Sequence, residues 1–217
     1  MKIKLILAAS KTDPLRKNDP FMPLSLPLLA STAPNHDYTL LDMLWEDDPG
    51  YDEPVDLVGI SVRFTAENSA YKMAEEFRRR GVKVILGGPQ ISSVPLRAIK
   101  FADAVAVGEG EELWPVIVKD FEANTLKQLY VCSPKPFLAE GYTIYQVNRY
   151  PELSRTPVAL RQLMNHKYTF DTLFASRGCP IGCDFCSVPQ IFGTTYRLRT
   201  IDHVVKEIDT FKSYYYL

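Results

Sequence analysis

Short apolar runs rich in β-branched residues alternate with helical patterns between Lys2 and about Glu122. The runs predict strands at residues 3–8, 38–45, 55–61, 82–86 and 104–107. Several runs are nearly uninterrupted, which is typical of parallel strands covered on both faces. Apolar positions at helical spacing predict a helix over residues 66–80, ended by Gly81. The pattern therefore predicts an α/β fold with a doubly wound, five-stranded parallel sheet.

Two further helices are expected within this first part of the chain. One covers residues 111–123, where Glu111 and Glu112 suit the positive end of a helix dipole. The other is a short helix at 24–31, inside a proline-rich loop that follows the first strand. Doubly wound sheets bind ligands beyond the carboxyl ends of their strands, where the strand order reverses. We therefore expect a ligand site in the loops that follow Ser61, Leu86 and Val107.

The rest of the chain is less regular. Residues 132–167 contain four prolines and no sustained period, which indicates a connector with a hairpin around 142–147. A strand at 170–176 and an amphipathic helix at 201–212 are expected after it. We divide the chain into a nucleotide-fold domain at 1–130, a connector at 131–168 and the start of a second domain at 169–217.

Composition narrows the possible partners. The 217 residues are 46% hydrophobic and 24% charged, which is ordinary for a globular protein. Twenty-five basic and 26 acidic residues leave a net charge of -1, which disfavours binding to nucleic acid or to an anionic membrane. No signal peptide and no apolar run of about twenty residues is visible, so we expect a cytoplasmic protein with no membrane partner.

Three cysteines, Cys179, Cys183 and Cys186, fall within eight consecutive residues. Without a signal peptide, metal binding is a better interpretation than disulfides. Three thiolates at CxxxCxxC spacing can each bind one iron of a cubane cluster, because soft sulfur ligands suit iron-sulfur centres. The fourth iron then keeps an open position, as catalytic metal centres do. The alternatives are free thiols or a zinc site completed by Cys132, His166 or His203.

The segment 176–186, with Phe185 directly before the last cysteine, resembles the signature loop of the radical S-adenosylmethionine superfamily. The resemblance implies that Cys179, Cys183 and Cys186 ligate a 4Fe-4S cluster and that Phe185 packs near the adenine of S-adenosylmethionine. It also implies the first strand, loop and helix of a partial (β/α) barrel. An electron donor such as flavodoxin or ferredoxin and a small-molecule substrate are the implied partners.

Two glycine turns extend this resemblance to the first part of the chain. The turns Gly87-Gly88-Pro89 and Gly108-Glu109-Gly110 each follow a predicted strand. Neither is a GxGxxG or Walker loop, which disfavours dinucleotides and nucleoside triphosphates. Taken singly, such glycines are also ordinary turn residues. Together with the cysteine loop, they resemble the class of radical enzymes with an N-terminal, Rossmann-like or flavodoxin-like cobalamin-binding domain.

That resemblance implies a set of cobalamin-contacting positions. They are Ser61, Gly87, Gly88, Pro89, Gly108, Glu109 and Gly110. The Asp-x-His-x-x-Gly motif that supplies a histidine ligand in many cobalamin domains is missing after the first strand, where Ser10-Lys11-Thr12-Asp13-Pro14 stands instead. Cobalamin is therefore expected here without a histidine lower ligand.

Two functions follow from these expectations. The first is a cobalamin-dependent radical enzyme that cleaves S-adenosylmethionine to a 5'-deoxyadenosyl radical for methyl transfer, carbon-carbon bond formation or ring modification. The alternative is a non-catalytic module that binds a corrinoid or another small ligand and has a structural or regulatory cysteine loop. About thirty residues follow the last loop cysteine, whereas a (β/α) barrel spans about 250. We therefore expect an N-terminal fragment of a longer enzyme, inactive by itself.

Overall fold

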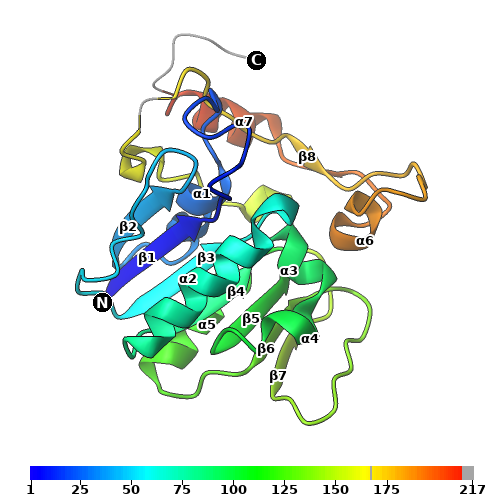
Figure 1. Ribbon diagram of the computed structural model, residues 1–217. Coiled ribbons are helices and arrows are strands. Elements are labelled where there is room, and N and C mark those ends of the chain that lie inside the picture. Colours follow the sequence, from blue (N-terminus) through cyan, green and yellow to red (C-terminus); the bar gives the residue numbers. More distant parts are fainter. Residues whose placement is uncertain (167, 212–217) are drawn as a thin grey trace.

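A seven-stranded, all-parallel sheet forms the centre of the computed structural model, which describes residues 1–166 and 168–211 (Figure 1). Its strands are β1 Lys2–Leu7, β2 Asp37–Asp42, β3 Leu57–Ser61, β4 Lys83–Gly87, β5 Ala104–Gly108, β6 Leu129–Cys132 and β7 Ile144–Val147. They lie in the order β2-β1-β3-β4-β5-β6-β7, and every neighbouring pair is parallel. The order reverses at β1 and β3, which is the switch point where such sheets bind ligands.

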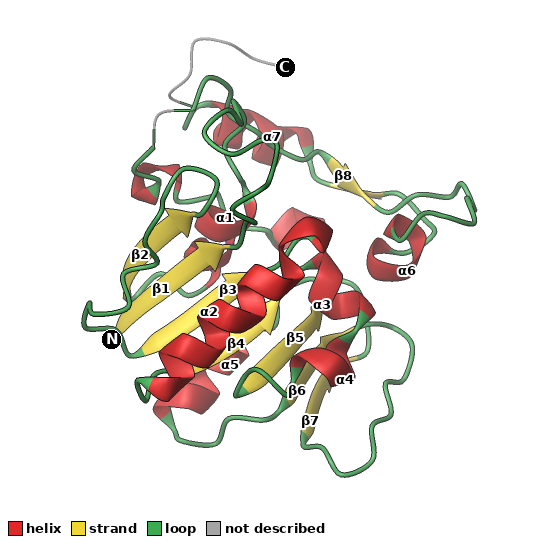
Figure 2. Ribbon diagram, in the orientation of Figure 1, coloured by secondary structure: helices red, strands yellow, loops and turns green. Residues whose placement is uncertain are grey.

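Helices cover both faces of the sheet (Figure 2). Helices α2 Glu67–Arg79, α3 Pro89–Ser93 and α4 Pro95–Ala98 lie on one face, and α1 Ser25–Thr32 and α5 Trp114–Glu122 lie on the other. Successive side chains of a strand point to opposite faces. In β1, Ile6 belongs to the same buried cluster as Phe77 of α2, whereas Leu5 belongs to the cluster that contains Trp114 of α5. The sheet therefore has a buried core on each face, and the predicted doubly wound α/β fold is confirmed.

The predicted count of five strands was too low, because β6 and β7 extend the sheet. The predicted hairpin at 142–147 is also wrong, since β7 pairs in parallel with β6. The returning loop is held by a side chain: the Gln146 amide donates to the carbonyls of Ser133 and Lys135 and accepts from the Phe137 N–H. The predicted boundaries at 130 and 168 stay predictions, although β6 itself crosses the first.

The chain after the sheet contains short elements. These are the 3₁₀ helices η2 Leu153–Arg155 and η3 Arg161–Leu163, the strands β8 Ser176–Arg177 and β9 Arg197–Leu198, and the helices α6 Val188–Phe192 and α7 Ile201–Ile208. A further 3₁₀ helix, η1 Phe64–Ala66, precedes α2. The predicted strand at 170–176 is wrong except for its last residue. Phe170 instead pairs with residues 20–22, donating to the Pro20 carbonyl and accepting from the Met22 N–H.

Strands β8 and β9 pair in antiparallel fashion and form the base of a hairpin that carries the cysteine loop and α6. This hairpin lies beyond the carboxyl ends of the parallel strands (Figure 1). Helix α7 confirms the start of the predicted helix at 201; residue 212, where that helix was predicted to end, lies outside the described residues. In the described part of the chain, no helix is long and apolar enough to cross a membrane.

Candidate functional site

A cavity of about 270 Å³ opens at the carboxyl edge of β1, β3, β4 and β5. All seven positions predicted to contact cobalamin line it, namely Ser61, Gly87, Gly88, Pro89, Gly108, Glu109 and Gly110. Helices α1 and α5 form its other side through residues such as Leu26 and Ile117. Residues Arg177 of β8 and Phe192 of α6 also contribute to the lining. The cavity therefore lies between the switch point of the sheet and the cysteine-bearing hairpin.

At the inner end of the cavity, a strand residue without a side chain leaves space that is bounded by apolar side chains. A Cβ atom on Gly59 of β3 would lie 2.7 Å from Leu5 Cδ2 and 3.1 Å from Trp114 Cη2. Trp114 is buried, and its Nε1 donates to the Tyr38 hydroxyl at 3.1 Å. With its polar atom bonded away from the cavity, Trp114 contributes an apolar indole surface. Gly59 and Trp114 were not among the residues predicted from the sequence.

Two of the predicted glycines occupy backbone conformations that other residues rarely adopt. Gly88 has φ +97°, and a Cβ there would lie 2.7 Å from Val62 N. Gly108 has φ +86°, and a Cβ there would lie 2.3 Å from the Cys132 carbonyl oxygen. A non-glycine residue at either position would combine backbone strain with overlap against main-chain atoms.

Ser92 of α3 forms hydrogen bonds with both glycine turns. Its hydroxyl donates to the Gly88 carbonyl at 3.0 Å and accepts from the Gly108 N–H at 2.9 Å. A serine in a helix can bond back to the carbonyl four residues earlier, which here belongs to Gly88, the residue directly before α3. Ser92 was not among the residues predicted from the sequence; its spacing from Gly88 is a local signal, whereas the bond to Gly108 depends on the sheet.

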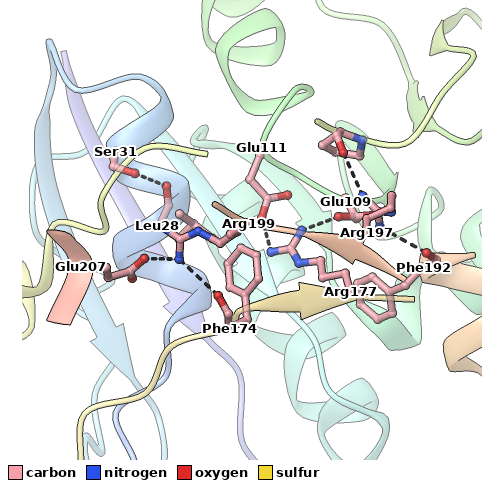
Figure 3. Close-up of polar contacts among 11 residues, drawn as sticks. Leu28, Ser31, Glu109, Glu111, Phe174, Arg177, Phe192, Arg197, Arg199 and Glu207 are labelled. Atoms are coloured by element: carbon pink, nitrogen blue, oxygen red, sulfur yellow. Dashed lines mark hydrogen bonds and ion pairs between the residues drawn. The ribbon is translucent and has the colours of Figure 1, made fainter. Parts of the chain in front are cut away.

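Two arginines join the Glu109 turn to the cysteine hairpin (Figure 3). The Glu109 carboxylate is fully buried and accepts from the guanidinium groups of Arg177 and Arg197. Arg177 also donates to the Glu111 carboxylate. Aromatic rings hold the arginines in place, with the Arg177 Cζ 4.2 Å from the Phe174 ring centre and the Arg197 Cζ 4.8 Å from that of Tyr150. Neither arginine was predicted as a site residue.

The charges in this cluster balance one another. Burial raises the pKa of the Glu109 carboxyl, and the two guanidinium groups oppose that rise. Burial acts to lower the pKa of Arg177, but the Glu111 and Glu109 carboxylates outweigh it, so that the pKa lies above its ordinary value. The two guanidinium groups thus lie where they counter the cost of burying the Glu109 carboxylate.

The cysteine loop is closed at its base by backbone contacts. The Cys179 N–H donates to the Gly193 carbonyl at 3.0 Å, and the Cys186 N–H donates to the Cys183 carbonyl at 3.1 Å. Gly178, with φ +88°, brings the loop so close to the other side of the hairpin that a Cβ would lie 2.1 Å from the Thr195 carbonyl oxygen. All three thiols are free and at least partly exposed, and Phe185 is 93% exposed. The loop therefore leaves three thiols accessible from solvent.

The zinc alternative has no support in the described residues. There, no three histidine, cysteine, aspartate or glutamate side chains converge on a single ion. Cys132 is buried in β6, and its thiol donates to the Arg149 carbonyl at 3.3 Å. His166 stacks on Trp45 with ring centres 3.7 Å apart. The three loop cysteines do not converge on one point either, so their role as ligands of a multi-iron cluster stays a prediction.

Comparison with known proteins finds a relative that aligns with most of the chain. The chain is 33% identical over 199 residues to the bacteriochlorophyllide d C-8(2)-methyltransferase of Chlorobaculum tepidum, an alignment that covers 91% of this chain and 42% of that protein. No family model matches the chain. The chain thus spans about two fifths of the length of this relative.

Two solved structures have the same fold. One is the cobalamin-dependent S-adenosylmethionine radical enzyme OxsB with aqua-cobalamin and S-adenosylmethionine bound, with a TM-score of 0.71 and 18% identity over 96% of this chain and 31% of that one. The other is the radical S-adenosylmethionine methyltransferase TsrM from Kitasatospora setae with cobalamin and a [4Fe-4S] cluster bound, with a TM-score of 0.66 and 18% identity over 96% of this chain and 46% of that one. The similarity confirms the fold class.

Proposed function

We propose that this chain is the cofactor-binding portion of a cobalamin-dependent radical S-adenosylmethionine methyltransferase. One observation carries the proposal: a single cavity is lined both by the glycine turns of the sheet and by the hairpin that bears Cys179, Cys183 and Cys186. The relative from Chlorobaculum tepidum, a methyltransferase, favours methyl transfer over the other radical reactions that the sequence suggested.

The volume of the cavity suits the nucleotide tail of cobalamin but not its corrin ring. Pockets that enclose a whole drug-sized ligand have volumes of about 300–1,000 Å³. At about 270 Å³, this cavity is too small for a corrin ring but large enough for the flat aromatic base of the nucleotide tail. We propose that the tail enters toward Gly59 and Trp114. The ring then lies at the mouth, over the turns at 87–89 and 108–110.

No histidine lines the cavity among the described residues. This is in line with the missing histidine motif after β1, and we propose that cobalt receives no imidazole ligand from this chain. The glycines at positions 87, 88, 108 and 110 instead allow the main chain to approach the ligand closely. The apolar inner lining excludes water from the buried part of the ligand.

The cysteine loop fits a cluster that has one open iron. We propose that the three thiolates each ligate one iron and that Phe185 packs near the adenine of S-adenosylmethionine. When bound, the two cofactors supply reductive cleavage of S-adenosylmethionine to a 5'-deoxyadenosyl radical and a carrier for the methyl group. The protein contributes placement, because the hairpin base is held against the Glu109 turn.

The partners follow from this chemistry. A flavodoxin or ferredoxin is proposed as the electron donor, and a small molecule as the methyl acceptor, in a cytoplasmic setting where thiols stay reduced. Turnover and the choice of acceptor are proposed for the whole protein, since the chain spans 42% of its methyltransferase relative.

Titration with hydroxocobalamin, followed by anaerobic reconstitution with iron and sulfide, tests the proposal. We expect a saturable change in the cobalamin absorption spectrum and cluster formation that is lost in Cys183→Ala but kept in Cys132→Ala. Cobalamin binding with no cluster in the wild-type chain would favour the alternative, a corrinoid-binding module with a structural cysteine loop. Binding of neither would refute the proposal.

A further inference from the structure

Arg177 and Arg197 are directly opposed in the register of β8 and β9, at the base of the cysteine loop. Like charges that face each other across an antiparallel pair destabilise the pairing. The Glu109 carboxylate lies between them, accepting from Arg177 through Oε2 and from Arg197 through Oε1 (Figure 3). The carboxylate therefore offsets the repulsion between the two opposed charges at the hairpin base.

The two arginines depend on Glu109 to different degrees. Arg177 has a second carboxylate partner in Glu111. Arg197 makes its other polar contacts with the carbonyl oxygens of Pro151, at 2.9 Å, and Phe192, at 3.2 Å. Among the described residues, Glu109 supplies the one carboxylate that pairs with Arg197. Loss of the Glu109 charge would leave Arg197 with carbonyl partners only.

The backbone of the same turn lines the cavity. Gly108 and Gly110 flank Glu109, and a Cβ on Gly110 would lie 3.0 Å from Leu29 Cδ1 on the cavity side of α1. A ligand held against the 108–110 turn therefore restricts the residue whose side chain closes the cysteine loop. Conversely, a cluster that orders the loop restricts the turn that meets the ligand.

We propose that Glu109 is a positioning residue that couples occupancy of the cavity to ordering of the cysteine loop, through its shared ion pairs with Arg177 and Arg197. This inference rests on the proposed function, because it assigns cobalamin to the cavity and an iron-sulfur cluster to the loop. Energetic coupling between two sites is reciprocal. Each cofactor therefore raises the affinity of the other, by a factor on the order of ten.

Hydroxocobalamin affinity, measured with and without the reconstituted cluster, tests the coupling in wild type, Glu109→Gln and Glu112→Gln. Glutamine keeps the side-chain shape and removes the charge. Glu112 is the matched control, since it lies in the same segment but pairs with Arg149 instead of the hairpin. We expect the affinity ratio to be about tenfold in wild type and in Glu112→Gln, and to fall toward one in Glu109→Gln. A ratio of one in wild type, or an unchanged ratio in Glu109→Gln, would overturn the proposal.

Hydrogen exchange in the cofactor-free protein supplies a readout that is independent of either cofactor. Faster amide exchange across residues 176–198 is expected in Glu109→Gln but not in Glu112→Gln. The double variant Glu109→Gln/Arg197→Met removes one of the opposed charges, so it should regain protection that the single variant lost. No rescue would show that Glu109 acts by packing and would overturn the charge argument. Failure of wild type to bind either cofactor would refute the proposed function, while the exchange result would still decide whether Glu109 holds the hairpin.

Discussion

Gly59 of β3 lies against the indole of Trp114, so that a Cβ on Gly59 would come within 3.1 Å of Trp114 Cη2. A larger residue at 59 would therefore fill the inner end of the cavity. We predict that Gly59→Val weakens hydroxocobalamin binding at least tenfold and lowers the free energy of unfolding by about 1–3 kcal/mol through overpacking. Spectral titration and urea denaturation measure the two effects.

The matched control is Ile85→Val, which trims the same cavity lining without narrowing it. It should cost about 0.5–1.5 kcal/mol of stability and keep cobalamin affinity close to that of wild type. Equal loss of affinity in both variants would show that binding follows stability and not the space beside Gly59.

The two glycines of neighbouring strand ends should differ sharply in tolerance to alanine. Gly108 has a positive φ, and a Cβ there would overlap the Cys132 carbonyl, whereas a Cβ on Gly87 would be 3.5 Å from its nearest neighbour, Ala106 Cβ. Backbone strain alone should make Gly108→Ala lower the free energy of unfolding by about 1–3 kcal/mol. Gly87→Ala should change it by less than about 1 kcal/mol. Chemical denaturation of both variants decides this, and similar values would contradict the turn geometry.

The four cysteines should react at very different rates. Cys132 is buried, and burial, with the nearby carboxylates of Glu109 and Glu112, raises the pKa of its thiol to about 12. Iodoacetamide at pH 8 should label Cys179, Cys183 and Cys186 in the native, metal-free protein and reach Cys132 only after denaturation. Peptide mass spectrometry measures the labelling. Rapid labelling of Cys132 in the native protein would show that its thiol is not protected from solvent.

The same thiol predicts a loss of stability at alkaline pH. An unfolded cysteine ionises near pH 8.5, whereas the folded chain holds its proton until about pH 12. Between these values the unfolded state loses a proton that the folded state keeps, so the stability contributed by Cys132 falls as pH rises. The free energy of unfolding should decline less steeply above pH 9 in Cys132→Ala than in wild type. Parallel declines would show that the thiol does not titrate in this way.

A second buried ion cluster fixes the end of the described chain. Glu207 of α7 is fully buried and pairs with Arg161, at 2.6 Å, and with Arg199. Removing the charge leaves two buried guanidinium groups without their shared carboxylate. Glu207→Gln should therefore lower the free energy of unfolding by about 3–5 kcal/mol. Lys206→Gln, an exposed neighbour on the same helix, should stay within about 0.5 kcal/mol of wild type. Urea denaturation compares them, and a small effect at Glu207 would contradict the burial.

Four of the first five strands, β1, β3, β4 and β5, could be predicted because they are short, mostly apolar runs buried in the sheet. Strand β2 instead alternates buried and more exposed positions, which is also a strand pattern. Strand β7 could not be predicted, since its four side chains are only half-buried and its return loop is held by the Gln146 amide. The glycine turns could be predicted because their signal, like that of the buried strands, is local in the sequence. A glycine at the end of a strand, such as Gly108, or directly after it, such as Gly88, indicates a turn from the local sequence alone.

The ion pairs of the site lay beyond sequence reasoning. Glu109 and Arg177 are 68 positions apart, and nothing local indicates that they meet. The contact arises because the hairpin lies beyond the carboxyl ends of the strands. In the same way, the sequence shows Gly59 only as a glycine within an apolar strand, and its closeness to Trp114 is given by the structure.

We propose that this chain holds cobalamin and an iron-sulfur cluster on facing sides of one cavity mouth. Electron paramagnetic resonance of the anaerobically reconstituted and reduced chain, loaded with cob(II)alamin, tests it most directly. We expect a cob(II)alamin signal and a cluster signal that are broadened and split by magnetic coupling. A spectrum equal to the sum of two independent signals, or one that lacks either signal, would contradict it.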